Sequence, residues 1–235
     1  MEREVPMATR KPAGRRRASQ ARSKATVERI LDSAASLIVE KGADGVTMTE
    51  IARRADVVIG SLYQYFADKS AINRALLVRH HEEVGRMLRG YLSDVGTFND
   101  FAAGIEAAAA KYYELHQSDP LFNGIWSAVQ TDAELQRIDL ADTLQNARQL
   151  HAISKPLLPA VDSDELMATC ALLIQFALTT GRFALAMPAP LKRQMLPIYR
   201  RIMRGALDAL YAENAHNRPG RNTARRGRGE RPPPR

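Results

Sequence analysis

The sequence predicts an all-helical protein in which a small three-helix N-terminal domain is joined to a larger helical domain, with about nine helices in all. Apolar residues recur at three- and four-residue steps along most of the chain, as they do on the buried stripe of an amphipathic helix. Between the two ends, no stretch alternates apolar and polar residues as a half-buried strand does. Residues 47–69 have the pattern of two short helices separated by a tight turn.

Composition indicates an ordinary soluble protein of the cytoplasm. The chain has 235 residues, 45% of them hydrophobic, and its one cysteine cannot form a disulfide within the chain. Residues 1–23 lack the apolar run of a secretory signal. Residues 166–187 are the most apolar stretch, but they include Gln175 and Arg182 and read better as a buried helix than as a membrane span. We therefore expect no membrane partner.

The net charge of +8 is concentrated at the two ends of the chain. Residues 1–25 hold eight Lys or Arg and two acidic residues, and residues 216–235 hold seven and one, which leaves −4 for the rest. Such segments cannot bury enough apolar surface to offset the entropy cost of ordering. We expect a disordered basic arm over 1–25 and a disordered basic tail over 214–235. Between them the pattern indicates a helix-turn-helix domain, 26–80, and a larger domain, 81–213.

Local signals place the helix boundaries. Gly42 can end a first helix, and Thr47 followed by Glu50 is a capping-box pattern that begins a second helix over 48–55. Asp68 is a suitable N-cap for a long helix over 69–93. Further helices are expected over 100–117, 120–130, 133–157, 163–187 and 190–211.

Six apolar residues in residues 47–69 are spaced to hold two short helices at a steep angle. They are Ile51, Ala52, Ala55, Val57, Leu62 and Phe66. Packing of these side chains would leave the outer face of the second helix free to enter the major groove of DNA.

The same segment resembles the signature of the TetR family of transcriptional repressors. The residues in register are Ala55, Val57, Gly60, Ser61, Leu62, Tyr63, Tyr65, Phe66 and Lys69. The resemblance is strong over residues 26–80 and extends to the remainder only as an all-helical layout. It implies a homodimer that binds double-stranded operator DNA and is released by a small-molecule effector. We also expect no cofactor and no enzymatic activity, because no catalytic or metal-binding group of residues is evident.

Carried over to this chain, the resemblance implies that residues 59–65 form the recognition helix. Gln64 is the strongest candidate for a base contact, because an amide can bond two positions of an adenine edge. The DNA-binding candidates are Thr47, Thr49, Ile59, Gly60, Ser61, Tyr63, Gln64, Tyr65 and Lys69. The alternative for Thr47 is a helix cap alone, and for Tyr63 a partly buried core position.

Two residues depart from the family pattern. Asp56 stands in the turn where glycine is common, and aspartate tolerates a left-handed backbone better than most residues. Val58 stands at the cap of the recognition helix where Ser or Thr is common, and valine cannot cap. Its presence should cost about 1 kcal/mol of local helix stability.

The resemblance implies that the larger domain encloses the effector, and the last two helices are candidates for the dimer interface. Effector pockets are mostly apolar with a few polar groups, so the candidates are Tyr113, Phe122, Trp126, Gln130, Arg148, Gln175 and Phe176. The last two helices would form a four-helix bundle with a second copy. The interface candidates are Leu166, Leu173, Phe176, Thr180, Met195, Ile198, Ile202 and Leu210. For aromatic residues at helical spacing, a plain core role is the alternative.

No grouping of residues suggests catalysis or a metal site. His80 and His81 are adjacent and point to different faces of a helix, and Cys170 lies in an apolar run. The alternative function is nonspecific binding to nucleic acid or anionic surfaces through the arginine-rich tails. The N-terminal arm could follow the DNA backbone or act only as a solubilising extension.

Overall fold

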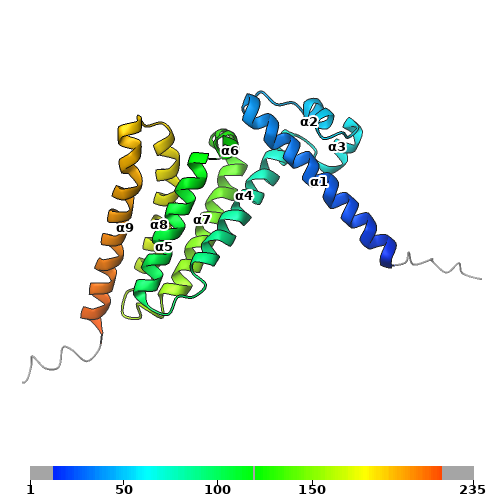
Figure 1. Cartoon of the computed structure of the whole chain (residues 1–235). Helices are drawn as coiled ribbons and strands as arrows, with labels where there is room; N and C mark the ends of the chain where they lie inside the picture. Colours follow the sequence, from blue (N-terminus) through cyan, green and yellow to red (C-terminus); the bar gives the residue numbers. More distant parts are fainter. Residues whose placement is uncertain (1–12, 119, 219–235) are drawn as a thin grey trace, which may run out of the picture. The chain divides into compact units, whose positions relative to one another are not determined.

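The computed structural model describes residues 13–118 and 120–218, and every regular element in this part of the chain is a helix (Figure 1). The helices are α1 (Ala13–Lys41), α2 (Met48–Arg54), α3 (Ile59–Tyr65), α4 (Lys69–Tyr91), α5 (Phe98–Ser118), α6 (Pro120–Thr131), α7 (Ala133–Ser154), α8 (Ser163–Leu185) and α9 (Ala189–Asn217). The predicted all-helical class is confirmed.

The chain divides into two compact units. The first ends at Leu77 and also takes in Gly124–Ala128 of α6. The second begins at Val78 and contains the rest of α4 together with α5, α7, α8 and α9. The long helix α4 therefore belongs to both units.

Both ends of the helical region extend beyond the sequence prediction. α1 begins at Ala13, so residues 13–25 are helical rather than disordered. Alanine and arginine are strong helix formers, and a helix that is already anchored by buried side chains can extend without a new nucleus. α9 runs to Asn217, and the buried Asn214 side chain accepts a hydrogen bond from the Ala160 amide at 2.9 Å. Residues 1–12 and 219–235 lie outside the described residues.

The first unit is built on a core shared by α1, α2, α3 and the start of α4. Its largest buried side chains include Ile30, Leu37, Ile51, Leu62, Phe66, Ile72 and Leu76. Of the six inward residues predicted for the helix-turn-helix, five are buried and Val57 is half-buried. This core fixes α2 against α1 and α3 against α2.

The second unit is a helical bundle in which α8 packs against α5, α7 and α9. Figure 1 shows these four helices side by side. Polar bonds join them as well, since the Tyr199 hydroxyl donates to the Leu173 carbonyl at 3.1 Å and the Tyr113 hydroxyl donates to the Lys192 carbonyl at 3.0 Å.

The helix α8 is long and apolar enough to cross a membrane by length and composition alone. That is weak support for a span, because a core helix passes the same test. One face of α8 buries Leu166, Cys170 and Leu173 in the core of the second unit.

Candidate functional site

The start of α2 is held by the capping box that the sequence predicts. The Glu50 amide donates to the Thr47 hydroxyl at 3.3 Å, and the Thr47 amide donates to the Glu50 carboxylate at 3.1 Å. Lys41 also bonds the Glu50 carboxylate. These bonds, with the one to Lys41 the strongest, lower the pKa of Glu50 to about 2. Thr47 is therefore engaged as a cap.

The turn between α2 and α3 has a left-handed residue at Asp56, with φ of 52°. The Val57 amide then bonds back to the Ala52 carbonyl at 3.0 Å, which closes the turn. An aspartate side chain can adopt this backbone at modest cost, as the sequence analysis expected. The turn thus keeps its geometry without glycine.

The helix α3 has one inward and one outward face. Leu62 is fully buried, whereas Ile59, Tyr63, Gln64 and Tyr65 are exposed. A helix anchored by one buried leucine and presenting most of its other side chains to solvent is suited to enter a major groove.

The residue before α3 makes no side-chain cap. Val58 occupies the N-cap position in extended conformation, with φ of −68° and ψ of 140°, and forms no side-chain hydrogen bond there. Its side chain is 79% exposed. The first turn of α3 therefore lacks the hydroxyl that would satisfy an amide at this position.

The remaining DNA-binding candidates differ in their availability. Thr49 and Gly60 are exposed, and Ser61 is half-buried. Lys69 is half-buried, and its ammonium donates hydrogen bonds to the backbone carbonyls of Ala43 and Asp44. The structure thus ties Lys69 to the loop between α1 and α2, which its sequence position did not indicate.

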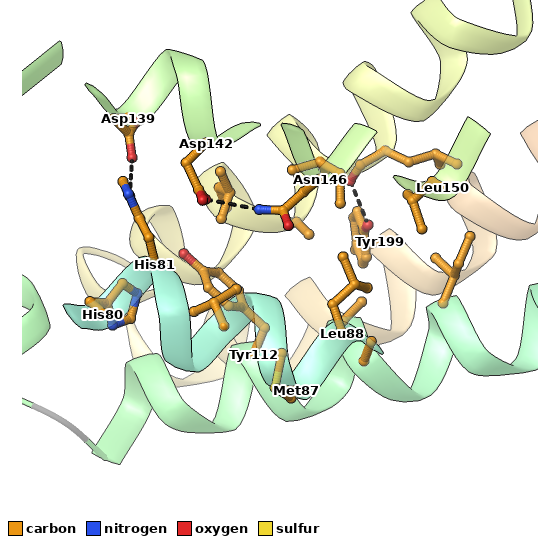
Figure 2. Close-up of a pocket in the computed structure, with 18 residues that line it drawn as sticks. His80, His81, Met87, Leu88, Tyr112, Asp139, Asp142, Asn146, Leu150 and Tyr199 are labelled. Atoms are coloured by element: carbon orange, nitrogen blue, oxygen red, sulfur yellow. Dashed lines mark hydrogen bonds and ion pairs between the residues drawn. The ribbon is translucent and has the colours of Figure 1, made fainter. Parts of the chain in front are cut away.

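A cavity of about 50 Å³ lies in the second unit, among α4, α5, α7, α8 and α9 (Figure 2). Most of its wall is aliphatic or aromatic. Its polar lining residues are His80, His81, Tyr112, Asp139, Asp142, Asn146 and Tyr199. A dry cavity of about 150 Å³ can hold benzene, so an organic ligand would have to displace lining side chains here.

Two hydrogen-bonded pairs form the polar wall of the cavity. His81 Nε2 lies 3.1 Å from an Asp139 carboxylate oxygen, and the Asn146 amide donates to the Asp142 carboxylate at 2.8 Å. Figure 2 shows both pairs along one side of the cavity. Burial raises the pKa of Asp142, the nearby Asp139 carboxylate adds to this shift, and His81 and Asn146 oppose it.

Two further histidines are held neutral by burial. Desolvation lowers the pKa of His80 to about 3, with contributions from His116 and His81. It lowers the pKa of His116 to about 4, although the hydrogen bond to the Tyr112 carbonyl opposes the shift. In residues 13–118 and 120–218 no three His, Cys, Asp or Glu side chains are arranged to hold a metal ion.

The effector candidates lie elsewhere. Six of the seven, with Phe122 the exception, have described side chains, and none of these six lines the cavity. Trp126 belongs to the first unit, and the Tyr113 hydroxyl bonds a backbone carbonyl. Gln130, Arg148, Gln175 and Phe176 are exposed. The α6 residue Phe122 has a side chain outside the described part of the structure.

Sequence reasoning missed the polar wall of the cavity, although a signal was present. Asp139, Asp142 and Asn146 follow one another at steps of three and four, which places three polar residues on one face of α7. Together with the adjacent His80 and His81 on α4, they are the polar groups that an otherwise apolar pocket would use.

The interface candidates divide into two groups. Leu166, Leu173 and Leu210 are buried in the core of the second unit. The other five candidates lie on one outer surface of α8 and α9, which we call the α8–α9 face. They are Phe176, Thr180, Met195, Ile198 and Ile202. The α8–α9 face is lined by Phe176, Thr179, Thr180, Phe183, Met195, Ile198, Tyr199 and Ile202. Four of these side chains are exposed large hydrophobics: Phe176, Phe183, Ile198 and Ile202.

A helix-turn-helix unit followed by a larger helical unit is an architecture typical of DNA-binding transcriptional regulators. Family models agree with this class. Residues 30–76 match the model of the bacterial regulatory proteins of the tetR family, and residues 99–211 match a tetracyclin repressor-like C-terminal domain. The chain belongs to the TetR family of transcriptional regulators. Such regulators bind DNA and are not enzymes. This confirms the expectation from the sequence that the protein is not an enzyme.

Curated relatives match over a short segment. The A-factor receptor protein of Streptomyces griseus is 43% identical over 60 residues, 26% of this chain and 22% of the relative. The HTH-type transcriptional repressor KstR of Rhodococcus jostii is 39% identical over 57 residues, 24% of this chain and 27% of the relative. The matches thus span less than a third of the length of these two relatives.

Solved structures match over most of the chain. A TetR-family regulator from Streptomyces coelicolor has a TM-score of 0.59 at 24% identity, covering 79% of this chain and 99% of that one. A second TetR-family regulator, from Pectobacterium atrosepticum, has a TM-score of 0.62 at 17% identity. The match covers 81% of this chain and 96% of that one. RolR, solved with its ligand resorcinol, has a TM-score of 0.57 at 18% identity. The match covers 86% of this chain and 98% of that one. At these identities the likeness establishes the fold.

Proposed function

We propose that this protein is a ligand-responsive repressor that acts in the cytoplasm. Two copies form a dimer, place α3 in successive major grooves of a palindromic operator, and leave the DNA when a small molecule occupies the cavity of the second unit. The observation that carries the proposal is α3 itself. Its buried Leu62 anchors a helix whose exposed Tyr63, Gln64 and Tyr65 are suited to contact a duplex.

The roles on the DNA follow from side-chain chemistry. Gln64 would read a base edge, while the hydroxyls of Tyr63 and Tyr65 would bind phosphates. Thr49, Ile59, Gly60 and Ser61 would line the same surface, and Thr47 would contribute mainly as the cap of α2. Lys69 would position α4 through its bonds to backbone carbonyls rather than contact DNA.

The dimer is proposed to form through the α8–α9 face. Exposed large hydrophobic side chains on neighbouring helices, such as Phe176 and Ile202, are a usual mark of a protein–protein interface. A two-fold pairing of α8 and α9 would bury this face in a four-helix bundle. Symmetry would then present two copies of α3 to one operator.

Response to a ligand is supported by the cavity. RolR, which shares the fold, was solved with the small molecule resorcinol, and the name of the Streptomyces griseus relative describes a receptor. In this chain α4 carries Lys69 in the first unit and the cavity residues His80 and His81 in the second. Ligand and DNA would prefer different separations of the two N-terminal units in the dimer, with α4 transmitting the change. Such coupling has to be reciprocal.

Selection of bound sequences from a random double-stranded DNA library tests the proposal. The expected result is an inverted repeat whose half-sites lie about one helical turn, or a multiple of it, apart. Purified, folded protein that shows no preference for any duplex sequence would contradict the proposal.

Operator titrations at several salt concentrations test nonspecific binding through the arginine-rich tails. The variant replaces Arg15, Arg16, Arg17 and Arg22 with glutamine, which removes charge while keeping good helix formers. If the arm contacts phosphates, the dependence of operator affinity on salt becomes less steep. An unchanged slope excludes such contacts, and loss of all DNA binding would favour tail-driven association.

A further inference from the structure

Three side chains stand between the cavity and solvent. His81, Asp142 and Asn146 line the cavity and also line an open groove between α4 and α7. They therefore form a thin wall that is reached from the cavity on one side and from the groove on the other. Displacement of these side chains would open a route into the cavity.

The wall has a carboxylate that forms no ion pair with Lys or Arg. Asp142 bonds the neutral Asn146 amide, and no Lys or Arg within the described residues lies at ion-pair distance from it. His81 is bonded to Asp139 rather than to Asp142, although its charge lowers the pKa of Asp142. Asp139 also interacts with the partly buried Arg182. Arg89 lines the groove but makes no ion pair with Asp142.

We propose that the cavity binds an organic cation, with its ammonium group at Asp142 and its apolar body among Leu88, Ile105 and Ile174. This inference rests on the proposed function, since it takes the cavity as the effector site. The ligand would enter through the groove between α4 and α7 and would displace lining side chains, because the cavity of about 50 Å³ is smaller than an organic ligand needs. Its ammonium would replace the Asn146 amide as the hydrogen-bond donor to Asp142.

Charge and surroundings favour this class of ligand over the others. Asp142 is half-buried, so it has lost part of its hydration, and a cation compensates for this loss more strongly than it would in bulk water. An anionic ligand would add a further negative charge beside Asp139 and Asp142. A neutral ligand would fill the apolar part of the cavity but leave Asp142 uncompensated. Burial raises the pKa of Asp142, as expected for a carboxylate without a full counter-charge.

Three probes with one apolar body test the inference: phenylbutylamine, phenylbutanol and phenylbutanoate. Binding to the full-length protein is measured by calorimetry near neutral pH. We expect the amine to bind about tenfold more tightly than the alcohol, because a charged ammonium donor is attracted to the carboxylate more strongly than a neutral hydroxyl donor is. The carboxylate should bind more weakly than the alcohol.

Two variants locate the binding site. Asp142→Asn still accepts the Asn146 hydrogen bond, so it should fold, lose the preference for the amine, and keep the affinity for the alcohol. Ala177→Leu adds side-chain volume to the cavity wall and should weaken both probes. The matched control is Asp94→Asn, an exposed carboxylate outside the cavity, which should preserve the order of the three affinities.

Several results would overturn the inference: equal affinity for amine and alcohol, no binding of the amine, or a preference that survives Asp142→Asn. Operator release gives a separate readout of the proposed function. If phenylbutanoate binds best and releases the DNA, the ligand response stands and the cation inference is wrong. If the amine binds selectively but leaves operator affinity unchanged, the cation site stands and the proposed ligand response is wrong.

Discussion

Lys69, the first residue of α4, donates a hydrogen bond from its ammonium to the backbone carbonyl of Ala43 at 3.0 Å. A second bond reaches the Asp44 carbonyl at 3.2 Å. Both carbonyls lie in the loop between α1 and α2, so one side chain connects the start of α4 to the entry of the helix-turn-helix.

Lys69→Met keeps the apolar stem of the side chain and removes the ammonium. We expect the free energy of unfolding to fall by about 1 kcal/mol, because two carbonyls lose a charged donor. The salt dependence of operator binding should stay unchanged. Thermal unfolding and operator titrations at several salt concentrations measure the two effects. A slope reduced by about one, without loss of stability, would instead show that Lys69 contacts a phosphate.

Gln64→Ala should relax sequence preference at one base pair of each half-site. Operator affinity should fall by roughly tenfold, since a bidentate base contact contributes about 1–3 kcal/mol of discrimination. The salt dependence should not change, because no charge is removed. Repeating the library selection with this variant gives the measurement. Gln194→Ala, at an exposed position of α9, is the control, and equal effects of the two substitutions would refute the role of Gln64.

Val58→Ser supplies the cap that α3 lacks. The backbone already has the extended conformation of an N-cap and the valine is 79% exposed, so little burial is lost. We expect the free energy of unfolding to rise by about 1 kcal/mol. Chemical denaturation measures this change, with Val58→Ala as a control that cannot cap. A serine variant no more stable than the alanine variant would count against the missing cap.

Ile202→Glu places a charge on the α8–α9 face. The side chain is 58% exposed, so the single chain should fold normally while the proposed dimer dissociates. Size-exclusion chromatography with light scattering should show a monomer, and binding to a palindrome should weaken. Leu140→Glu introduces the same charge at a similarly exposed position of α7, 57%, and should remain dimeric. A dimeric Ile202→Glu variant would place the interface elsewhere.

Stability should fall as the pH is lowered below neutral, in part because of His116. Burial lowers its pKa to about 4 from an ordinary 6.5, so between these values the unfolded chain binds more protons than the native one. The contribution is complete above pH 6.5 and is lost as the pH falls toward 4, at up to about 1.4 kcal/mol per pH unit.

His116→Asn isolates this contribution. The asparagine amide can still donate to the Tyr112 carbonyl, which His116 bonds at 3.0 Å, but it does not titrate. Unfolding measured from pH 7 to pH 5 should therefore depend less on pH than in the parent. His216→Asn changes an exposed histidine at the end of α9 and serves as the control. An unaltered pH dependence in His116→Asn would contradict the assignment.

The sequence by itself determined the local architecture of this protein. Three local features depend only on residues a few positions apart: the capping box of Thr47 and Glu50, the left-handed Asp56 and the inward Leu62. Short-range hydrogen bonds and periodicities of this kind can be predicted from the local sequence. The uncapped Val58 was predicted for the same reason.

Only the tertiary structure decided where the cavity lies and what lines it. Its polar wall unites His81 of α4 with Asp139 of α7, 58 residues further along the chain. Residue type could not place such a site: Tyr113 and Phe176 are plausible pocket aromatics, yet one bonds the start of α9 and the other faces solvent. Which helix faces meet depends on the packing of the whole bundle, and no local pattern encodes it.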